Sequence, residues 1–308
     1  MAVDIAPRSA RQHCDPHSVD YLGLPKAACE RLKRKKESLL LLSMIQDTDT
    51  DVGDEELDVV GMLLARGGDV NARDPKSRRS LLSSASARGH VKLVRLLLIR
   101  GAPDPVRATW CPPALVRLVQ SDVLWLRTGA TVGLEDRDGW TALMKAAENG
   151  HADIVALLLA QGASVNNQDS TGGWSALMKS SERGHLEVVR MLLDAGALID
   201  QRDWGGFTAL MKSAWMNHIA VMRLLLDHEA DIDAQDTLFG VTALMVACVY
   251  GRAPLVELLL ERGADPCKVS NAGATAMDIL LREPQMPGEA SLQDKADAER
   301  ILRQHMVG

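Results

Sequence analysis

Aromatic residues are scarce in this sequence of 308 residues, which contains six Trp, two Phe and two Tyr. A folded chain with so few rings must build its core from Leu, Val, Ala and Met, and its hydrophobic content of 46% is ordinary for a globular protein. A basic excess is also missing, because the net charge is −6. This balance argues against a dedicated nucleic-acid-binding protein, and we expect no direct nucleic-acid binding.

Cysteines and long apolar runs are few as well. Five cysteines are scattered along the chain without a CxxC pair, so neither a disulfide framework nor a zinc site is expected, and a reducing compartment fits. The first residues contain no apolar core for a signal peptide. The longest strongly apolar run, "LLLLSMI" at 39–45, is far shorter than the roughly 20 residues of a membrane span. We expect a soluble, cytoplasmic protein without a membrane span.

Signatures of catalysis are absent from the sequence. It has no HExxH motif, Walker glycine loop or GxSxG elbow, and its carboxylates form no convincing pair. Four histidines occupy one position of a repeated unit, which favours a structural role at the start of a helix over a metal or acid–base array: His90, His151, His185 and His218. We predict a protein that is not an enzyme, with no catalytic residue, metal, cofactor or small-molecule substrate.

The chain does contain one unit that is written several times. "GWTALMKAAENGHADIVALLLAQGASVN" at 139–166 is followed by "GWSALMKSSERGHLEVVRMLLDAGALID" at 173–200, and further copies begin at Gly206 and Gly240. The glycine after each leucine-rich run recurs at spacings of 34, 28, 33, 34, 33 and 34 residues, if Glu229 is counted where it replaces the glycine. This period is typical of a helix–turn–helix–loop repeat.

Each copy can be divided into two short helices and a polar loop. A hydroxyl residue that can cap the first helix occurs in four copies, at Thr141, Ser175, Thr208 and Thr242. Gly150 and Gly184 suit the left-handed end of that helix, and Asn217 is the next-best residue for this conformation. A second helix is predicted at 153–161 from its apolar spacing. Because neither helix is long enough to be stable alone, the copies are expected to stack.

The repeated pattern G-x-T-A-L-M-x-A-A-x-x-G-H-x-x-I-V-x-x-L-L-L-x-x-G-A-x-V-N resembles the ankyrin repeat, most clearly over 138–271. The resemblance implies an all-α solenoid of stacked helix–turn–helix units with short β-hairpin loops, about seven repeats and a C-terminal cap. The Thr-Pro-Leu-His of that family is Thr-Ala-Leu-Met here. Apolar packing is therefore expected to replace a hydrogen bond at Met144, Met178, Met211 and Met245.

The expected organisation is a disordered N-terminal tail at 1–24 followed by a solenoid at 25–308. An N-terminal capping repeat at 25–74 contains an acidic loop at 47–56. Further repeats are expected at 75–107, 108–137, 138–171, 172–204, 205–238 and 239–271, with a C-terminal cap at 272–308. The unit at 108–137 is about five residues short and contains Pro112 and Pro113, so we expect a truncated and distorted repeat there, and the effect on the curvature of the stack is open.

Seven of the ten aromatic residues lie between Trp140 and Tyr250. Trp140, Trp174 and Phe207 share the position before the capping residue, which in the ankyrin family often contacts a ligand. Covering the hairpins and stacking on neighbouring repeats explains Trp140 and Trp174 equally well. None of the seven is expected at a core position.

The other four of these aromatic residues are interpreted as binding residues, because exposed rings are enriched in interface hot spots. Trp204 and Phe239 are expected near loop tips. Trp215 and Tyr250 are expected at the exposed end of the first helix.

A stripe of lysines runs beside the rings at Lys145, Lys179 and Lys212. The first two lie three residues before a glutamate on the same helix face, which can neutralise them. Lys212 lacks such a glutamate and is expected to pair with an acidic group of a ligand. We take the group Trp204–Phe207–Lys212–Trp215 as the centre of the binding surface. The whole candidate set is Trp140, Lys145, Trp174, Lys179, Arg183, Trp204, Phe207, Lys212, Trp215, Met216, Phe239 and Tyr250.

These features predict non-catalytic protein–protein recognition by an adaptor, scaffold or inhibitor that binds a partner protein on the concave face of the stack. A rigid stack holds its contact groups in fixed register and loses little entropy on binding. Three alternatives stay open: a nuclear regulatory protein that binds a transcription or chromatin factor, a substrate-recognition adaptor of a larger complex, and an enzyme accessory or cryptic hydrolase. The candidate nuclear localisation signal is Lys33, Arg34, Lys35 and Lys36, although the solvated face of a helix explains these residues as well.

Overall fold

The computed structural model describes residues 53–65, 68–98, 129–282 and 292–306, together with residues 36–38, 40 and 43. β-pairing within these residues is limited to an isolated bridge between Arg73 and Ser80. The helices are α2 (Asp54–Ala65), α3 (Leu81–Arg88), α4 (Val91–Leu98), α6 (Ala142–Glu148), α7 (Ala152–Ala160), α8 (Ala176–Arg183), α9 (Leu186–Asp194), α10 (Ala209–Trp215), α11 (Ile219–Asp227), α12 (Ala243–Val249), α13 (Ala253–Glu261), α14 (Ala276–Leu280) and α15 (Leu292–Met306).

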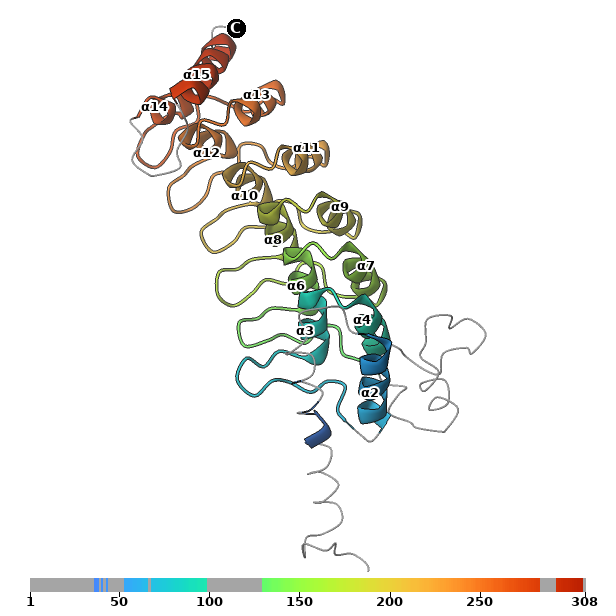
Figure 1. The fold of residues 1–308 in the computed structure, drawn as a ribbon. Coiled ribbons are helices and arrows are strands. Elements are labelled where there is room, and N and C mark those ends of the chain that lie inside the picture. Colours follow the sequence, from blue (N-terminus) through green and yellow to red (C-terminus); the bar gives the residue numbers. More distant parts are fainter. Residues whose placement is uncertain are drawn as a thin grey trace, which may run out of the picture.

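The helices form two layers that repeat along one axis (Figure 1). The inner layer consists of α3, α6, α8, α10, α12 and α14, and each of these helices contacts the next one of the layer. The outer layer consists of α4, α7, α9, α11 and α13, with the same order of contacts. The described loops between helix pairs project to one side of the stack (Figure 1). The expected all-α solenoid of stacked units is confirmed.

The inner-layer helices begin and end where the sequence predicts. The hydroxyl oxygens of Thr141, Ser175, Thr208 and Thr242 each accept a hydrogen bond from a backbone N–H in the first helical turn. This bond satisfies one of the donors that a helix N-terminus leaves free. Gly184 ends α8 with a φ of +77°, and Asn217 has a φ of +64° at the same position of the next repeat. The expected left-handed turns are confirmed.

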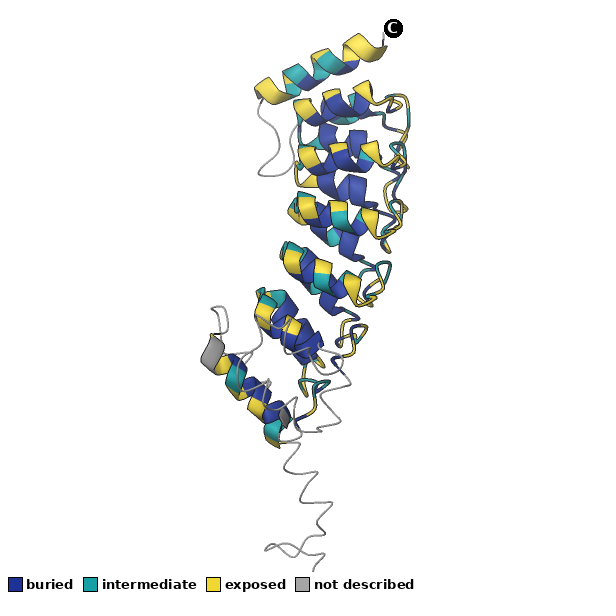
Figure 2. Cartoon of the chain, turned by 90° about the vertical axis from the view of Figure 1, so that its right-hand side faces the viewer, coloured by how far each residue is buried: buried dark blue, intermediate teal, exposed yellow. Residues whose placement is uncertain are grey.

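The core is aliphatic and continues from one repeat to the next (Figure 2). Leu143, Ile154 and Leu158 show how one repeat fills it, since all three side chains are at most 1% exposed. The methionines of the Thr-Ala-Leu-Met segments are equally buried, which confirms apolar packing at Met144, Met178, Met211 and Met245. Short helices that cannot enclose a core alone therefore share one along the stack.

The recurring histidines join neighbouring repeats. The Nε2 atoms of His151, His185 and His218 lie 3.2, 3.0 and 2.9 Å from the carbonyl oxygens of Ala87, Glu148 and Glu182, which belong to the preceding repeats. Each ring also packs on a glycine of the preceding repeat. A Cβ atom added at Gly184 would lie only 2.5 Å from Nδ1 of His218. The structural interpretation of these three histidines is confirmed.

Buried aspartates hold the projecting loops, and the sequence analysis did not identify them. Oδ1 of Asp169 accepts hydrogen bonds from the backbone N–H groups of Gly172, Gly173 and Trp174 at 2.9, 2.9 and 3.2 Å. Asp136, Asp203 and Asp236 bind their own loops in the same way. These bonds fix tight hairpin loops that contain no regular strand within the described residues.

Parts of the predicted organisation lie outside the described residues. These parts are the tail at 1–24, most of the acidic loop at 47–56 and of the basic cluster at 33–36, and residues 108–128 of the predicted truncated repeat. Among the described helices, α3 contacts α6 and α4 contacts α7 directly. The truncated repeat predicted at 108–137 therefore does not separate the unit at 75–107 from the unit at 138–171. At the other end, α15 packs on α13 and α14, and its Ala298 and Leu302 are fully buried. Among the helices that are described, none combines the length and hydropathy of a bilayer-spanning segment.

Candidate partner-binding surface

Lysines and aromatic rings alternate along the inner layer in an arrangement that we call the lysine–aromatic ladder. Its members are Trp140, Lys145, Trp174, Lys179, Phe207 and Lys212. Nζ of Lys179 lies 3.8 Å from the ring centre of Trp174 and 5.3 Å from that of Trp140. Nζ of Lys212 likewise lies 3.8 Å from the ring centre of Trp174 and 4.6 Å from that of Phe207. Cation–π contacts therefore link adjacent repeats.

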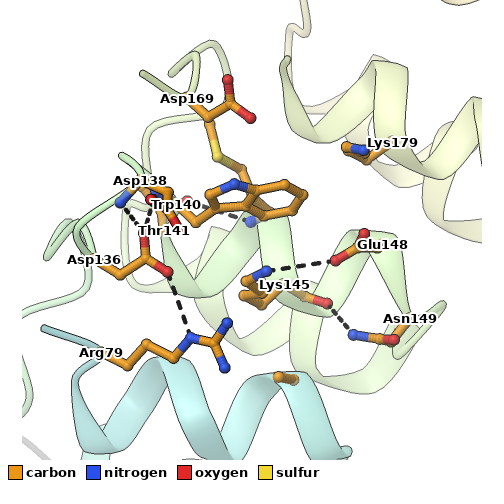
Figure 3. Close-up of polar contacts among 12 residues, drawn as sticks. Arg79, Asp136, Asp138, Trp140, Thr141, Lys145, Glu148, Asn149, Asp169 and Lys179 are labelled. Atoms are coloured by element: carbon orange, nitrogen blue, oxygen red, sulfur yellow. Dashed lines mark hydrogen bonds and ion pairs between the residues drawn. The ribbon is translucent and has the colours of Figure 1, made fainter. Parts of the chain in front are cut away.

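Lys145 shows the electrostatics of one step of the ladder (Figure 3). Its Nζ lies 3.6 Å from the ring centre of Trp140 and 3.6 Å from Oε2 of Glu148. Burial lowers the pKa of Lys145, and the charge of Arg79 lowers it further, while Glu148 and Asp136 act against this shift. Like Lys145, Lys179 pairs with its own glutamate, Glu182, at 3.4 Å. Both lysines are therefore neutralised within their repeats, as expected.

Lys212 does not carry the unpaired charge that the sequence suggested. Its Nζ lies 2.9 Å from Oδ2 of Asp203, and the two side chains are 10% and 5% exposed. Asp203 stands upstream in the hairpin loop, where its Oδ1 already accepts the backbone N–H groups of Gly205 and Phe207. The expectation that Lys212 awaits an acidic group of a ligand is wrong, because a carboxylate of its own repeat binds it.

Phe207 is a core residue, contrary to the expectation that none of the seven rings occupies the core. It is 9% exposed and belongs to the hydrophobic core cluster, against which Trp140 and Trp174 also pack. Its ring centre lies 6.2 Å from that of Trp215 in an edge-to-face contact, and Trp215 lies 6.2 Å from Tyr250. The lysine–aromatic ladder therefore ends in a group of three rings. Ring pairs at this distance and in offset or edge-to-face arrangements attract one another.

Five of the exposed large apolar side chains lie at two hairpin loops and at the end of α10. Trp204 is 67% exposed, Leu238 60% and Phe239 62%. At the end of α10, Trp215 is 46% exposed, and so is the neighbouring Met216. The predicted placement of Trp204 and Phe239 near loop tips agrees with this, and Leu238 adds an apolar side chain that the sequence analysis did not include.

A groove of about 1090 Å³ lies between the hairpin loops and the inner-layer helices. It brings together seven of the predicted residues, namely Trp174, Trp204, Phe207, Lys212, Trp215, Phe239 and Tyr250. Five others do not line it: Trp140, Lys145, Lys179, Arg183 and Met216. Arg183 instead lies 3.8 Å from Glu148 of the preceding repeat. The groove therefore includes the C-terminal members of the ladder, whereas the other three ladder residues, Arg183 and Met216 lie outside it.

The groove also contains residues that the sequence reasoning missed. Val241 and Val246 replace an aromatic ring and a lysine of the earlier copies. Leu238 could have been found as one half of an apolar pair in a polar loop. Arg282 and Lys295 line the end of the groove but follow the last clear copy of the repeat, so no repeat position could have indicated them.

Comparison with known proteins agrees with the repeated geometry. A family model described as ankyrin repeats matches residues 115–203, 168–236 and 200–270, which together cover just over half of the chain. The chain is 31% identical over 190 residues to ankyrin repeat and KH domain-containing protein mask-1 of Caenorhabditis elegans, and 29% identical over 148 residues to the similarly named protein CBG24701 of Caenorhabditis briggsae. These alignments cover 50% and 37% of this chain.

The relatives are much longer than the matched segments. The chain spans 7% and 6% of the length of those two proteins. A further alignment, 31% identical over 122 residues, involves an L-asparaginase of Dirofilaria immitis and covers 38% of this chain and 20% of that enzyme. Similarity over such a small share of each relative is informative about the repeats and leaves the rest of those proteins unmatched.

Proposed function

This chain belongs to the ankyrin repeat family, whose repeats form protein-interaction domains, and from this premise we propose that it is a non-catalytic adaptor or scaffold. Its partner is another protein, which binds on the inner face of the stack between the hairpin loops and the inner-layer helices. The repeats supply a rigid frame, so that few groups need to be ordered when the partner binds.

The groove is the single observation that carries this proposal. The groove has a volume of about 1090 Å³ and is lined by large apolar side chains. Single exposed apolar residues are ordinary on a protein surface, whereas a contiguous apolar surface of this kind marks an interaction site. Trp204, Phe239 and Trp215 are exposed around one hollow rather than spread over the molecule. Large aromatic residues that border a pocket are the residue type most often found at interface hot spots.

The test uses the double substitution Trp204→Ala and Phe239→Ala. Both side chains are more than 60% exposed, so their removal should leave the melting temperature nearly unchanged. The loss of two hot-spot rings should weaken capture of partner proteins by tenfold or more, since one such ring contributes about 2 kcal/mol. Affinity purification followed by mass spectrometry compares the proteins captured by the wild type and by the variant.

Leu198→Ala provides the matched control. Leu198 is 58% exposed and does not line the groove, so its removal also deletes exposed apolar surface. Capture should be retained by this variant. If the Trp204/Phe239 variant captured the same proteins in the same amounts as the control, the inner face would not be the binding surface.

A further inference from the structure

The charges that line the groove are unevenly distributed. Four charged residues are found among the described lining residues, namely Asp203, Lys212, Arg282 and Lys295. Asp203 and Lys212 neutralise one another at 2.9 Å. The remaining charges are therefore two cations, and both lie at the C-terminal end, on the segments that follow α14 and begin α15.

Arg282 and Lys295 are held together at that end. Nζ of Lys295 donates a hydrogen bond to the backbone carbonyl oxygen of Arg282 at 3.0 Å, and Arg282 is exposed. Neither residue forms a direct ion pair within the part of the chain that the structure describes. The groove thus ends in a basic site that shares its lining with the aromatic rings.

Asp278 is the acidic residue of α14 nearest in sequence to Arg282, but its carboxylate is committed to the start of that helix. Its Oδ2 accepts hydrogen bonds from the backbone N–H and the hydroxyl of Thr275, at 2.9 and 2.7 Å. Together these contacts form a capping box. The hydrogen bonds from Thr275 lower the pKa of the Asp278 carboxyl, and the nearby charge of Arg282 lowers it further. The two side chains form no direct ion pair, so the guanidinium of Arg282 can still bind an anionic group from outside.

The rest of the lining accepts large apolar groups. The rings of Phe207, Trp215 and Tyr250 pack on one another in a row, and the exposed side chains of Leu238 and Phe239 line the same groove from a hairpin loop. A partner cation would meet a less favourable site, because Lys212 already lies 3.8 Å from the ring centre of Trp174 and 4.6 Å from that of Phe207. The described lining also contains no unpaired carboxylate that could bind such a cation.

Resting on the proposed function, we propose that the groove binds a linear segment of the partner protein that combines bulky apolar side chains with a carboxylate. The apolar side chains lie against Trp215, Tyr250 and Phe239. The carboxylate, from Asp, Glu or a chain terminus, is bound by Arg282 and Lys295. The charge at one end of the groove also fixes the direction in which the segment lies.

The experiment selects random peptides displayed on phage against the immobilised full-length chain. Peptides that survive are synthesised, and their affinities are measured by fluorescence polarisation for the wild type and for the double variant Arg282→Glu/Lys295→Glu. The matched charge control is Arg190→Glu/Arg223→Glu, which reverses two exposed charges on the outer layer. Thermal melts of both double variants establish that the fold is retained.

We expect the selected peptides to carry apolar residues and carboxylates. Their affinity should fall by roughly tenfold or more when the groove cations are reversed, remain near the wild-type value in the outer-layer control, and weaken as salt is added. Selected peptides that lack carboxylates and bind the groove variant as tightly as the wild type, yet still need Trp204 and Phe239, would overturn this inference and leave the proposed function standing. Selection of peptides that ignore Trp204 and Phe239 altogether would contradict both.

Discussion

At the scale of single residues, the lysine–aromatic ladder places charged groups where side chains are mostly buried. Lys212 is 8% exposed, a position in which an ammonium group is costly unless a carboxylate and polarisable surfaces replace its water. Asp203 supplies the carboxylate at 2.9 Å, and the faces of Trp174 and Phe207 supply the rest. Lys212 is therefore a structural residue of its repeat, although it also lines the groove.

The substitution Lys212→Ala should destabilise the protein. It leaves the carboxylate of Asp203 buried without its cation, and breaking such a pair costs about 3 kcal/mol. Urea denaturation monitored by circular dichroism measures the loss. The double variant Lys212→Met/Asp203→Asn should lose less than the sum of its single changes, because neither remaining side chain carries an unpaired charge. A free energy of unfolding for Lys212→Ala within about 0.5 kcal/mol of the wild type would contradict the buried pair.

Two described cysteines should differ in reactivity. Burial raises the pKa of Cys248 from 9.0 to about 12, whereas Cys267 is exposed. Since the thiolate is the reactive form, iodoacetamide at mildly alkaline pH should modify Cys267 quickly and Cys248 only after unfolding. Peptide mapping by mass spectrometry distinguishes the two sites, and equal labelling rates would argue against this packing.

The same shift fixes the sign of a pH dependence. Because the folded thiol has the higher pKa, its contribution to stability is complete below pH 9 and is lost as the pH rises toward 12. Cys248→Ala should therefore remove part of the alkaline loss of stability. Denaturation midpoints measured for both proteins at neutral and alkaline pH provide the comparison.

The sequence predicted the ion pairs of single residues only where both partners lie on the same helix. The pairing of Lys145 with Glu148 was predictable, because both lie on one helix face at a fixed spacing. The pairing of Lys212 with Asp203 was not, because it requires the loop to fold back over α10. The burial of Phe207 follows from the same loop, whose geometry depends on backbone hydrogen bonds to Asp203.

At the scale of elements, the contact between neighbouring repeats explains why a glycine in one repeat occurs together with a histidine in the next. The positive-φ glycine at the end of an inner helix leaves space for the histidine of the next repeat, as Gly184 does for His218. Asn217 occupies the glycine position after α10. In the next repeat, the histidine position before α13 is occupied by Arg252. A side chain at the turn thus coincides with the loss of the ring that would have packed on it.

Gly184→Ala tests this junction, with Gly196→Ala as its matched control. Both glycines have positive φ, +77° and +85°, so both substitutions incur backbone strain of about 1–2 kcal/mol. A Cβ at Gly196 meets nothing within 4 Å, whereas at Gly184 it lies 2.5 Å from His218. Gly184→Ala should therefore lose a further 1–3 kcal/mol, roughly the cost of overpacking.

Urea denaturation measures both variants, and the double variant Gly184→Ala/His218→Ala isolates the clash. Removing the ring should restore part of the difference between the two alanine substitutions, although the hydrogen bond from His218 to the carbonyl of Glu182 is lost with it. Equal losses for Gly184→Ala and Gly196→Ala would mean that the histidine ring moves aside freely.

The elements themselves were largely predictable from the sequence. Caps such as Thr141 and Thr242 fixed where the inner helices start, since a hydroxyl cap is a local signal. The hairpin loops were recognised only as polar and glycine-rich. Their conformation depends on Asp169 and its equivalents, each of which binds several backbone groups at once, and a single acidic residue in a polar loop does not distinguish itself from its neighbours.

At the scale of the whole molecule, a stack of this kind has no single centre. Contacts of α8 are made with α6, α9 and α10, and those of α12 with α10, α13 and α14, so each repeat depends on its neighbours rather than on distant parts of the chain. Stability in such an array is close to a sum over repeats and interfaces. The groove and its basic end belong to the C-terminal repeats, which α15 covers.

The substitution Leu302→Ala examines how far the effect of that covering helix extends. Leu302 is fully buried where α15 packs on the last repeats, and its truncation should cost about 2–5 kcal/mol locally. In hydrogen exchange measured by mass spectrometry, amide protection should fall in α12–α15 and remain near the wild-type level in α6–α9, because coupling passes only between neighbours. Gln304→Ala, at an exposed position of the same helix, should leave both regions unchanged. A uniform fall in protection from α6 to α15 would instead show that the described stack unfolds as one cooperative unit. The effect of a groove substitution on binding could then not be separated from its effect on the stability of the whole stack.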